Sequence, residues 1–481
     1  MCPRCSRKFL RNMRLPTHRS LAILFASSLA ASISCQTAQK QTFLPPAKGQ
    51  APALTAASKP PEPPQSKAPV AAAPPQPKPQ VVQSNAARDL SPRVPDSDIH
   101  ELVSGNNQFA FDLYRQSTSQ ADNLFYSPYS ISIALAMVSA GAGGDTAAQM
   151  AQTMHFTLPP DRLHPAFNRL ALELASRSKV EGLKPGEVFQ LNVVNSLWGQ
   201  AGFVFERPFL DVLALNYGAG MRLVDYQKDA EAARKEINDW VSGSTNQRIK
   251  DLIPQGVLDP LTRLVLANAV YFKGAWGSPF DAHLTQPDTF HMFDGGTVPV
   301  EMMSQSTRLD AMLGDGYRAV EMPYAGGQLS MLVLLPDEGR FTDVEQRLSA
   351  GLVGETVAMM QEVEVDLQLP KFKVEWSAEL SKGLKALGMT DAFDPARADF
   401  SGMDGARDLF LSLILHKAFV SVDENGTEAA AATAAVVEAM AMPGNPTEPF
   451  HFRADRPFLF LIRDNPMGTI LFLGRVMNPA A

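Results

Sequence analysis

Long apolar runs with strand character recur along the chain, and they restrict its fold more than any other feature. They are VFQLNVVNSLW at 188–198, LVLANAVYF at 264–272, LSMLVLLP at 329–336, VEVDLQLPKFKVEW at 363–376, FLFLIRD at 458–464 and TILFLGRV at 469–476. The last two are separated by Asn465–Gly468, a spacing that predicts a hairpin. Strands of this length must pair with one another, so we expect large, mostly antiparallel sheets.

Helical periodicity is concentrated in the N-terminal half. It covers Glu101–Gln116, Ser130–Ala140, Ala166–Ser176 and a stretch from Ala230, for which Asp229 is a fair N-cap. A further helix is predicted from Ser377, as N-cap, to Leu387, with Gly388 ending it. Helices and sheets that segregate in this way predict the α+β class.

Composition divides the 481 residues into a leader, a spacer and one globular body. Twelve of the 37 prolines lie between Pro45 and Pro79, among Ala, Gln and Lys, and such a mixture buries too little apolar surface to fold. We therefore expect a disordered linker over 36–95 and a single folded domain over 96–481.

The leader, 1–35, has the pattern of a signal peptide. Arg14 and Arg19 precede the apolar run LAILFASSLAASIS, which is too short to span a bilayer, and Met13 is an alternative start. Small residues then lead to Cys35, as in the lipobox of bacterial lipoproteins, where a lipid-modified Cys becomes the mature N-terminus. Ser32 stands where that motif usually has Leu, so plain secretory cleavage remains the alternative. Either way, an extracellular or cell-envelope location is expected.

Charge and cysteine content narrow the functions open to the body. All three cysteines lie in the leader, so no disulfide and no cysteine metal site is expected in the body, and no cofactor or metal is indicated. Residues 1–34 hold six basic and no acidic residues, and their removal leaves 37 basic against 50 acidic residues. An acidic body argues against nucleic acid as a partner.

No catalytic signature is found. The nucleophile elbow, the HExxH zinc helix and the phosphate loop are all missing, and GAGGD at 141–145 favours a turn over a dinucleotide loop. Histidines and serines from distant positions could still assemble a triad, so an enzyme stays open at this point.

The stretch DENGTEAAAATAAVVEAMAMPG, 423–444, has a pattern of its own. Read as a strand, its odd positions from Thr427 to Val437 are all small and uncharged, while Glu428 and Glu438 share the other face. Alanine has poor strand propensity, and Asn425, Gly426 and Pro443 are loop formers. The segment is compatible with a strand but has no local drive to form one. An alanine-rich helix or passive linker is the alternative.

Five blocks of the sequence resemble the serpin family of serine protease inhibitors. ENGTEAAAATAAVV resembles the hinge of the family's reactive-centre loop, and the others, in the family's order, are NLFYSPYSISIALAMVSAGAGGDT (123–146), LANAVYFKGAW (266–276), LPKFKVEW (369–376) and RPFLFLIRDNPMGTILFLGRVMNP (456–479). The resemblance implies a fold of three β-sheets and about nine α-helices, with an exposed reactive-centre loop.

The resemblance also implies a mechanism. A protease cleaves the loop as a substrate, the loop inserts into the main sheet as a new strand, and the enzyme is carried along as an acyl-enzyme. About 15 residues at ~3.3 Å each would move it ~50 Å. We therefore expect an inhibitor that is used up in a single reaction, and not an enzyme. Its expected partner is a serine protease, to which it becomes covalently attached. A monomer is expected.

The resemblance assigns roles to particular residues. Counted from Glu424, the scissile bond joins Met440 and Ala441, with Ala439 or Met442 as alternatives for its first residue, and an apolar residue there suits elastase-, chymotrypsin- or subtilisin-like pockets. The hinge comprises Glu424, Gly426, Thr427, Ala429, Ala431 and Thr433. A polar cluster under the opening sheet, the shutter, comprises Ser127, Ser130, Asn268 and His416. Trp276 and Lys371 mark the breach, where the loop enters, and Lys371 is expected to pair with Glu424.

Membership of this family does not by itself imply inhibition, because some members act as carriers or chaperones. The small, uncharged inward face of the hinge favours inhibition. A non-inhibitory binding or scaffold protein of the cell envelope is the alternative.

Overall fold

The computed structural model describes residues 80–118, 122–178, 189–427 and 448–481. Within them the helices are α1 (Asp96–Ser117), α2 (Pro128–Ser139), α3 (Gly144–Thr153), α4 (Pro160–Ser176), α5 (Arg207–Tyr217), α6 (Tyr226–Ser244), α7 (Phe341–Arg347), α8 (Ala350–Met359), α9 (Ser381–Ala386) and α10 (Ser401–Asp404). Short 3-10 turns cover Ala282–Leu284 and Asp391–Phe393. The α+β class is confirmed, with ten α-helices in these ranges where about nine were expected.

The strands form two hydrogen-bonded sheets in the described ranges. The main sheet has the order β1 (Gln80–Val82), β4 (Met221–Val224), β3 (Phe189–Gln200), β5 (Leu264–Ala275), β13 (Gly426–Thr427), β12 (Leu411–Asp423) and β11 (Phe372–Glu379). The second has the order β14 (Phe450–Arg453), β10 (Gln361–Pro370), β7 (Thr297–Gly314), β8 (Tyr317–Pro323), β9 (Leu329–Pro336), β15 (Phe458–Asp464), β16 (Thr469–Val476) and β2 (Leu124–Tyr126), with β6 (Gln286–His291) pairing β7.

The second sheet explains why two sheets are found where three were expected. The long strand β7 pairs with β6 and β10 along most of its length and with β8 at its C-terminal end. It therefore belongs to two groups of strands at once, and backbone hydrogen bonds join them into one nine-stranded sheet.

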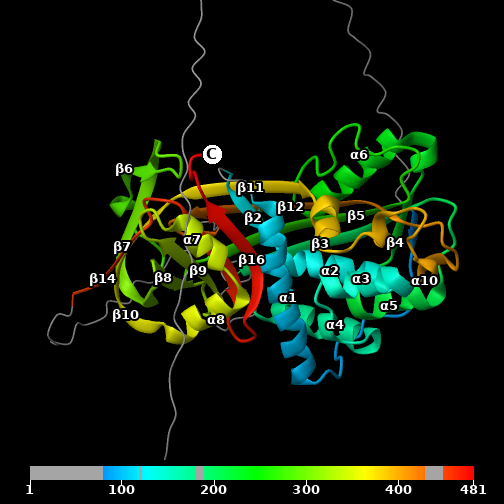
Figure 1. The fold of residues 1–481 in the computed structure, drawn as a ribbon, viewed down its shortest axis with the longest axis horizontal. Helices are drawn as coiled ribbons and strands as arrows, with labels where there is room; N and C mark the ends of the chain where they lie inside the picture. The colour runs from blue at the N-terminus through cyan, green and yellow to red at the C-terminus, as the bar shows by residue number, and fades with distance from the viewer. Residues whose placement is uncertain (1–79, 119–121, 179–188, 428–447) are drawn as a thin grey trace, which may run out of the picture. The chain divides into compact units, whose positions relative to one another are not determined.

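The main sheet has a different apolar layer on each face. One face packs in the large core, which includes Leu266, Val270 and Phe272 of β5. The other packs against α6 through Trp198, Ile237 and Val241. Figure 1 shows α6 on one side of the sheet and α2 to α5 on the other. An inserted strand would therefore meet apolar neighbours on both faces.

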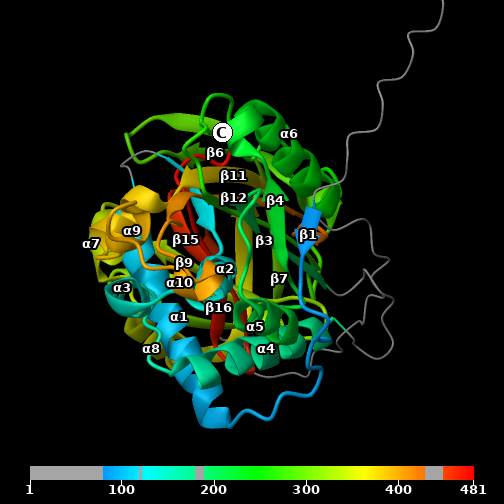
Figure 2. The same cartoon turned by 90° about the vertical axis from the view of Figure 1, so that its right-hand side faces the viewer.

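The N-terminal boundary of the body differs from the sequence expectation. Residues 80–95, assigned to the disordered linker, pack on the domain: Gln80–Val82 pair with Met221–Leu223, and the amide of Asp89 donates to the carbonyl of Leu215 at 2.9 Å. Figure 2 shows this arm running from β1 past α5 and α4. The linker prediction is wrong here because an edge strand such as β4 offers unpaired backbone groups that bind a neighbour whatever its composition.

Two local helix predictions have different outcomes. The side chain of Asp229 accepts from the amide of Ala232 at 2.9 Å, as expected of an N-cap, although α6 already begins one turn earlier. Ser377 does not cap a helix, because it pairs with Lys417 within β11 and the helix starts only at Ser381. Pairing with β12 outweighs the local helical pattern there.

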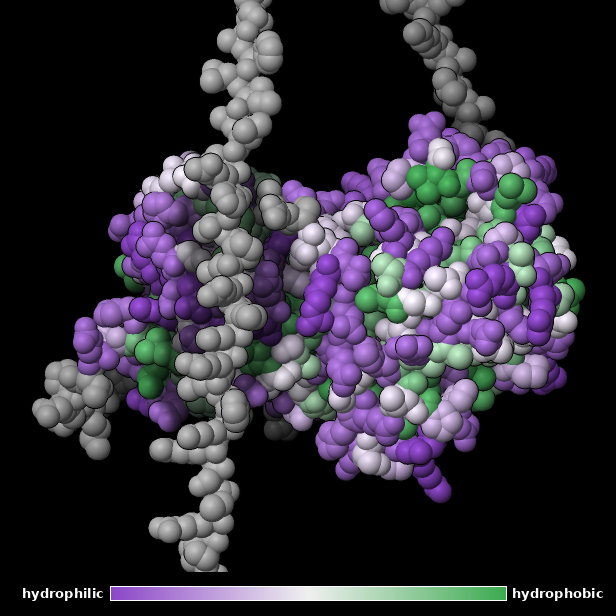
Figure 3. Space-filling view, in the orientation of Figure 1, coloured by the Kyte–Doolittle hydropathy of each residue, from purple (hydrophilic) through white to green (hydrophobic). Residues whose placement is uncertain are grey.

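Hydrophilic residues predominate on the face shown in Figure 3, and the apolar patches there are small and separate. Among the described helices none is both long and apolar enough to cross a membrane.

Candidate functional site: the hinge and seam of the main sheet

The candidate site is the seam between β5 and β12, because another segment of the chain lies between these strands at one end. These two strands are parallel neighbours from Leu264 and Leu411 to Tyr271 and Phe419, whereas β3 and β11 pair antiparallel to them on either side. At one end of the seam, β13 lies between them and is antiparallel to both. The chain after β12 has thus already entered the seam by two residues.

Thr427 is the last described residue of the hinge, and it is completely buried. Its hydroxyl lies 2.7 Å from the hydroxyl of Tyr324, whose ring stacks on Trp276 at 4.8 Å between centroids. This contact turns the Thr427 side chain toward the core. All odd-numbered positions of a strand that continued from it would face the same way.

Gly426 fits the entry point because it has no side chain. Its φ is +147°, and a Cβ atom added there would lie 2.0 Å from the carbonyl oxygen of Gly274. Any other residue would force the two strands apart, so the glycine is required for the hinge to enter.

The breach residues hold the turn that leads into the hinge. The indole nitrogen of Trp276 donates to the carbonyl of Asp423 at 3.0 Å, and its backbone amide donates to the carbonyl of Asn425 at 2.9 Å. The side chain of Asp423 accepts from the amide of Asn425 at 2.8 Å. Burial raises the pKa of this half-buried carboxyl group. The turn is therefore fixed from both sides.

The ion pair expected between Lys371 and Glu424 is present, with 2.7 Å between Nζ and Oε1. The hydroxyl of Thr285 donates to the same carboxylate at 2.7 Å. Burial acts to raise the pKa of Glu424, but the bonds from Lys371 and Thr285 outweigh it and hold the pKa below its usual value. The carboxylate stays ionised at the start of the hinge.

The four shutter residues meet beneath the seam, as Asn268 and His416 are directly paired across β5 and β12. Asn268 donates to the hydroxyl of Ser130 at 2.7 Å, and its carbonyl oxygen bonds Nδ1 of His416. Nε2 of His416 accepts from the amide of Ser127 at 3.2 Å, and the hydroxyl of Ser127 donates to the carbonyl of Leu471 at 2.6 Å. All four side chains are buried.

Burial lowers the pKa of His416 to about 3. A neutral ring with its proton on Nδ1 satisfies both contacts, because Nδ1 then donates to Asn268 and Nε2 accepts from Ser127. The ring is uncharged and bonded on both sides. It links β12 to β5 through Asn268.

Sequence reasoning missed a fifth member of this cluster, Asn195 of β3. Its side chain donates to the carbonyl of Ser130 at 3.3 Å and accepts from Asn268. Asn195 shares its face of β3 with Leu191 and Leu197, which pack in or against the large core. A polar residue on an otherwise apolar strand face is the signal that could have identified it. Tyr324 and Thr285 gave no such signal.

The other predicted site residues lie outside the described residues. These are Ala429, Ala431, Thr433, Met440, Ala441 and Cys35. In the described ranges, no cluster of three or more His, Cys, Asp or Glu residues could hold a metal ion.

A family model described as serpin (serine protease inhibitor) matches residues 104–479. The chain belongs to the serpin family. It is 43% identical over 378 residues to an uncharacterized serpin-like protein of Thermococcus kodakarensis, covering 79% of this chain and 86% of that protein. It is 40% identical over 397 residues to the leukocyte elastase inhibitor of Homo sapiens, covering 79% of this chain and all of the inhibitor.

Solved serpin structures agree with this assignment. The native state of the thermophilic serpin tengpin superposes with a TM-score of 0.72 at 27% identity, covering 83% of this chain and all of tengpin. Uncleaved ovalbumin superposes with a TM-score of 0.70 at 29% identity, covering 79% of this serpin and all of ovalbumin.

Proposed function

We propose that this serpin is a suicide-substrate inhibitor of serine proteases with elastase-, chymotrypsin- or subtilisin-like specificity. The observation that carries the proposal is the seating of Gly426 and Thr427 between β5 and β12. The leukocyte elastase inhibitors among its relatives support the protease class.

The register of β13 specifies how a longer insertion would pair. Thr427 is level with Gly274 of β5 and Val422 of β12. Continuing the same antiparallel register brings Thr433 level with Asn268 and His416. The intervening odd positions, Ala429 and Ala431, are small and would meet apolar rungs. Thr433, the next polar residue on this face after Thr427, would therefore lie beside the polar pair formed by Asn268 and His416.

Insertion along this path would trap a protease in the following way. The protease serine attacks the carbonyl carbon of Met440, the amino group of Ala441 leaves, and the chain stays attached to the enzyme as an ester. Strand formation then pulls the enzyme toward the far end of the seam. Misplacing catalytic groups by ~1 Å costs about a hundredfold in rate, so hydrolysis of the ester stalls.

The test is incubation of the purified protein with an elastase, a chymotrypsin and a subtilisin, followed by denaturing gels. We expect a covalent adduct with at least one of them, and sequencing of the released fragment should begin at Ala441. Cleavage at this bond by all three enzymes without any adduct would refute inhibition and favour a scaffold role.

A further inference from the structure

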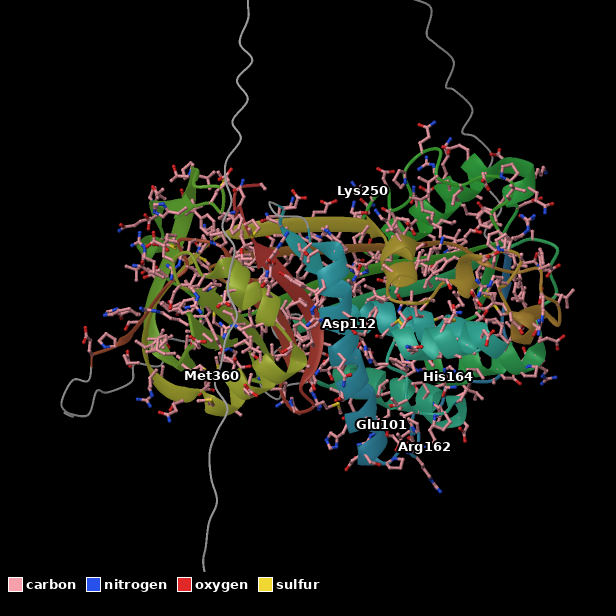
Figure 4. The ribbon with its side chains drawn as sticks, viewed as in Figure 1. Glu101, Asp112, Arg162, His164, Lys250 and Met360 are labelled. Carbon is pink, nitrogen blue, oxygen red and sulfur yellow. The ribbon has the colours of Figure 1, made fainter. Side chains whose placement is uncertain are left out.

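A cavity of about 530 Å³ lies beside the shutter, on the side of the main sheet that carries α2 and α4. Apolar and polar groups share its walls about equally. The apolar part includes Ile133 and Met137 of α2, Leu174 of α4, and Leu191 and Val193 of β3. In Figure 2, α2, α4, α5 and β3 are seen together on this side. His164 of α4, labelled in Figure 4, lies 2.7 Å from the hydroxyl of Tyr217, a lining residue. Cavities of this size bind small molecules in many proteins.

Arg88 of the N-terminal arm supplies the only charge among the described residues that line this cavity. Its Nε donates to the side chain of Asn168 at 2.8 Å, and within the described ranges no carboxylate forms an ion pair with it. Tyr129 lines the same cavity, and the charge of Arg88 acts against the rise that burial causes in the pKa of Tyr129. A single positive charge beside the apolar side chains of α2, α4 and β3 complements an anion with an apolar body.

We propose that this cavity binds one molecule of a single-chain amphiphile with an anionic head, the chain lying between α2, α4 and β3 and the head on Arg88. The carboxylate of a fatty acid and the phosphate of a single-chain phospholipid share the required chemistry. Arg88 suits both, because its planar donors bind either head group in pairs.

The cavity is also connected to the shutter. Asn195 lines it and bonds both Ser130 and Asn268. β3 pairs with β5 along eleven residues, so movement of β5 away from β12 carries β3 across α2. An occupant between α2 and β3 would resist this movement. We therefore expect a bound molecule to slow loop insertion. This effect rests on the proposed inhibitory function, whereas binding of the molecule to the cavity does not depend on that function.

Calorimetric titration with dodecanoate, below its micelle concentration, tests the binding. We expect one site per chain, no saturable binding of dodecanol, and affinity for dodecanoate about tenfold or more weaker in Arg88→Gln, because charged hydrogen bonds are lost. The matched control Arg93→Gln removes an exposed arginine of the same arm and should bind like the parent protein. A parallel titration with dodecyl phosphate shows which head group is preferred.

Filling the cavity with Ala171→Phe should abolish binding, with circular dichroism confirming that the variant is folded. No saturable heat with either anionic probe, or equal affinity in the parent and Arg88→Gln, would overturn the proposal. If an elastase adduct forms, saturating dodecanoate should raise the number of inhibitor molecules consumed per protease in the parent protein and not in Ala171→Phe. If no adduct forms with any protease, inhibition fails while the titrations still decide the binding site.

Discussion

Thr427 is enclosed at the entrance of the seam, and its replacement tests whether insertion must begin there. Thr427→Arg would place a charge against Tyr324 and Trp276, and burying an unpaired charge costs several kcal/mol. We expect the protease to cleave this variant and escape, so that the number of inhibitor molecules consumed per protease rises several-fold on a titration curve. Thr427→Ser, which keeps the hydroxyl, is the matched control. An unchanged stoichiometry in the arginine variant would count against the mechanism.

His416 predicts a pH dependence of stability. Its pKa is about 3 in the folded protein and near 6.5 when unfolded, so the unfolded chain takes up a proton first as the pH falls. The stabilisation is complete above pH ~6.5 and declines below it by ~1.4 kcal/mol per pH unit until the folded pKa is reached. Burial also lowers the pKa of His164, to about 4, and this group adds to the same slope.

Urea unfolding of His416→Gln at pH 7 and at pH 4.5 measures this contribution. The variant should lose less stability between the two pH values than the parent protein does, with the remaining loss due in part to His164. Equal losses in both proteins would mean that the ring of His416 is not buried as a neutral group.

At the residue level, prediction from sequence succeeded where the resemblance to the family assigned partners. The pair formed by Lys371 and Glu424 and the grouping of His416 with Asn268 were expected and are present in the structure. Tyr324 could not be anticipated, because its contact with Thr427 joins residues 103 positions apart through the fold and follows from no local pattern.

As an element, the inserted hinge strand is predicted to tolerate a charged side chain on one face and not on the other. Continuing from Thr427, Ala429 would face the core between Phe272 and Val420, whereas Ala430 would face the opposite side of the sheet. Ala429→Glu should therefore abolish formation of the covalent adduct with the target protease. Ala430→Glu, near the open end of the seam, should retain most of it. Equal loss in both variants on denaturing gels would show that the strand register is wrong.

Element boundaries were less predictable than element existence. The long strands and the β15–β16 hairpin follow their apolar runs, because burial on both faces requires continuous apolar sequence. β1 could not be predicted, because the residues QVV at 80–82 form a strand only by pairing with the free edge of β4 and show no strand pattern of their own. Local pattern likewise failed at Ser377, where pairing with β12 determines the conformation.

For the whole molecule, the proposed insertion predicts that the nicked protein is more stable than the intact one. A new strand would add backbone hydrogen bonds to both β5 and β12 and bury the small face of the hinge. After cleavage at Met440 by a protease used in trace amounts, we expect the unfolding temperature to rise by tens of degrees. The same cleavage in Ala429→Glu should produce little rise. A small change in the parent protein would favour a scaffold role.

The most direct measurement is a structure of the chain nicked after Met440. Our account predicts that residues from Gly426 onward form a full strand between β5 and β12, with Thr433 beside Asn268 and His416 and the direct contact between those two side chains broken. If β5 and β12 remain paired and Asn268 still bonds His416, the seam does not open, and the account of loop insertion is contradicted.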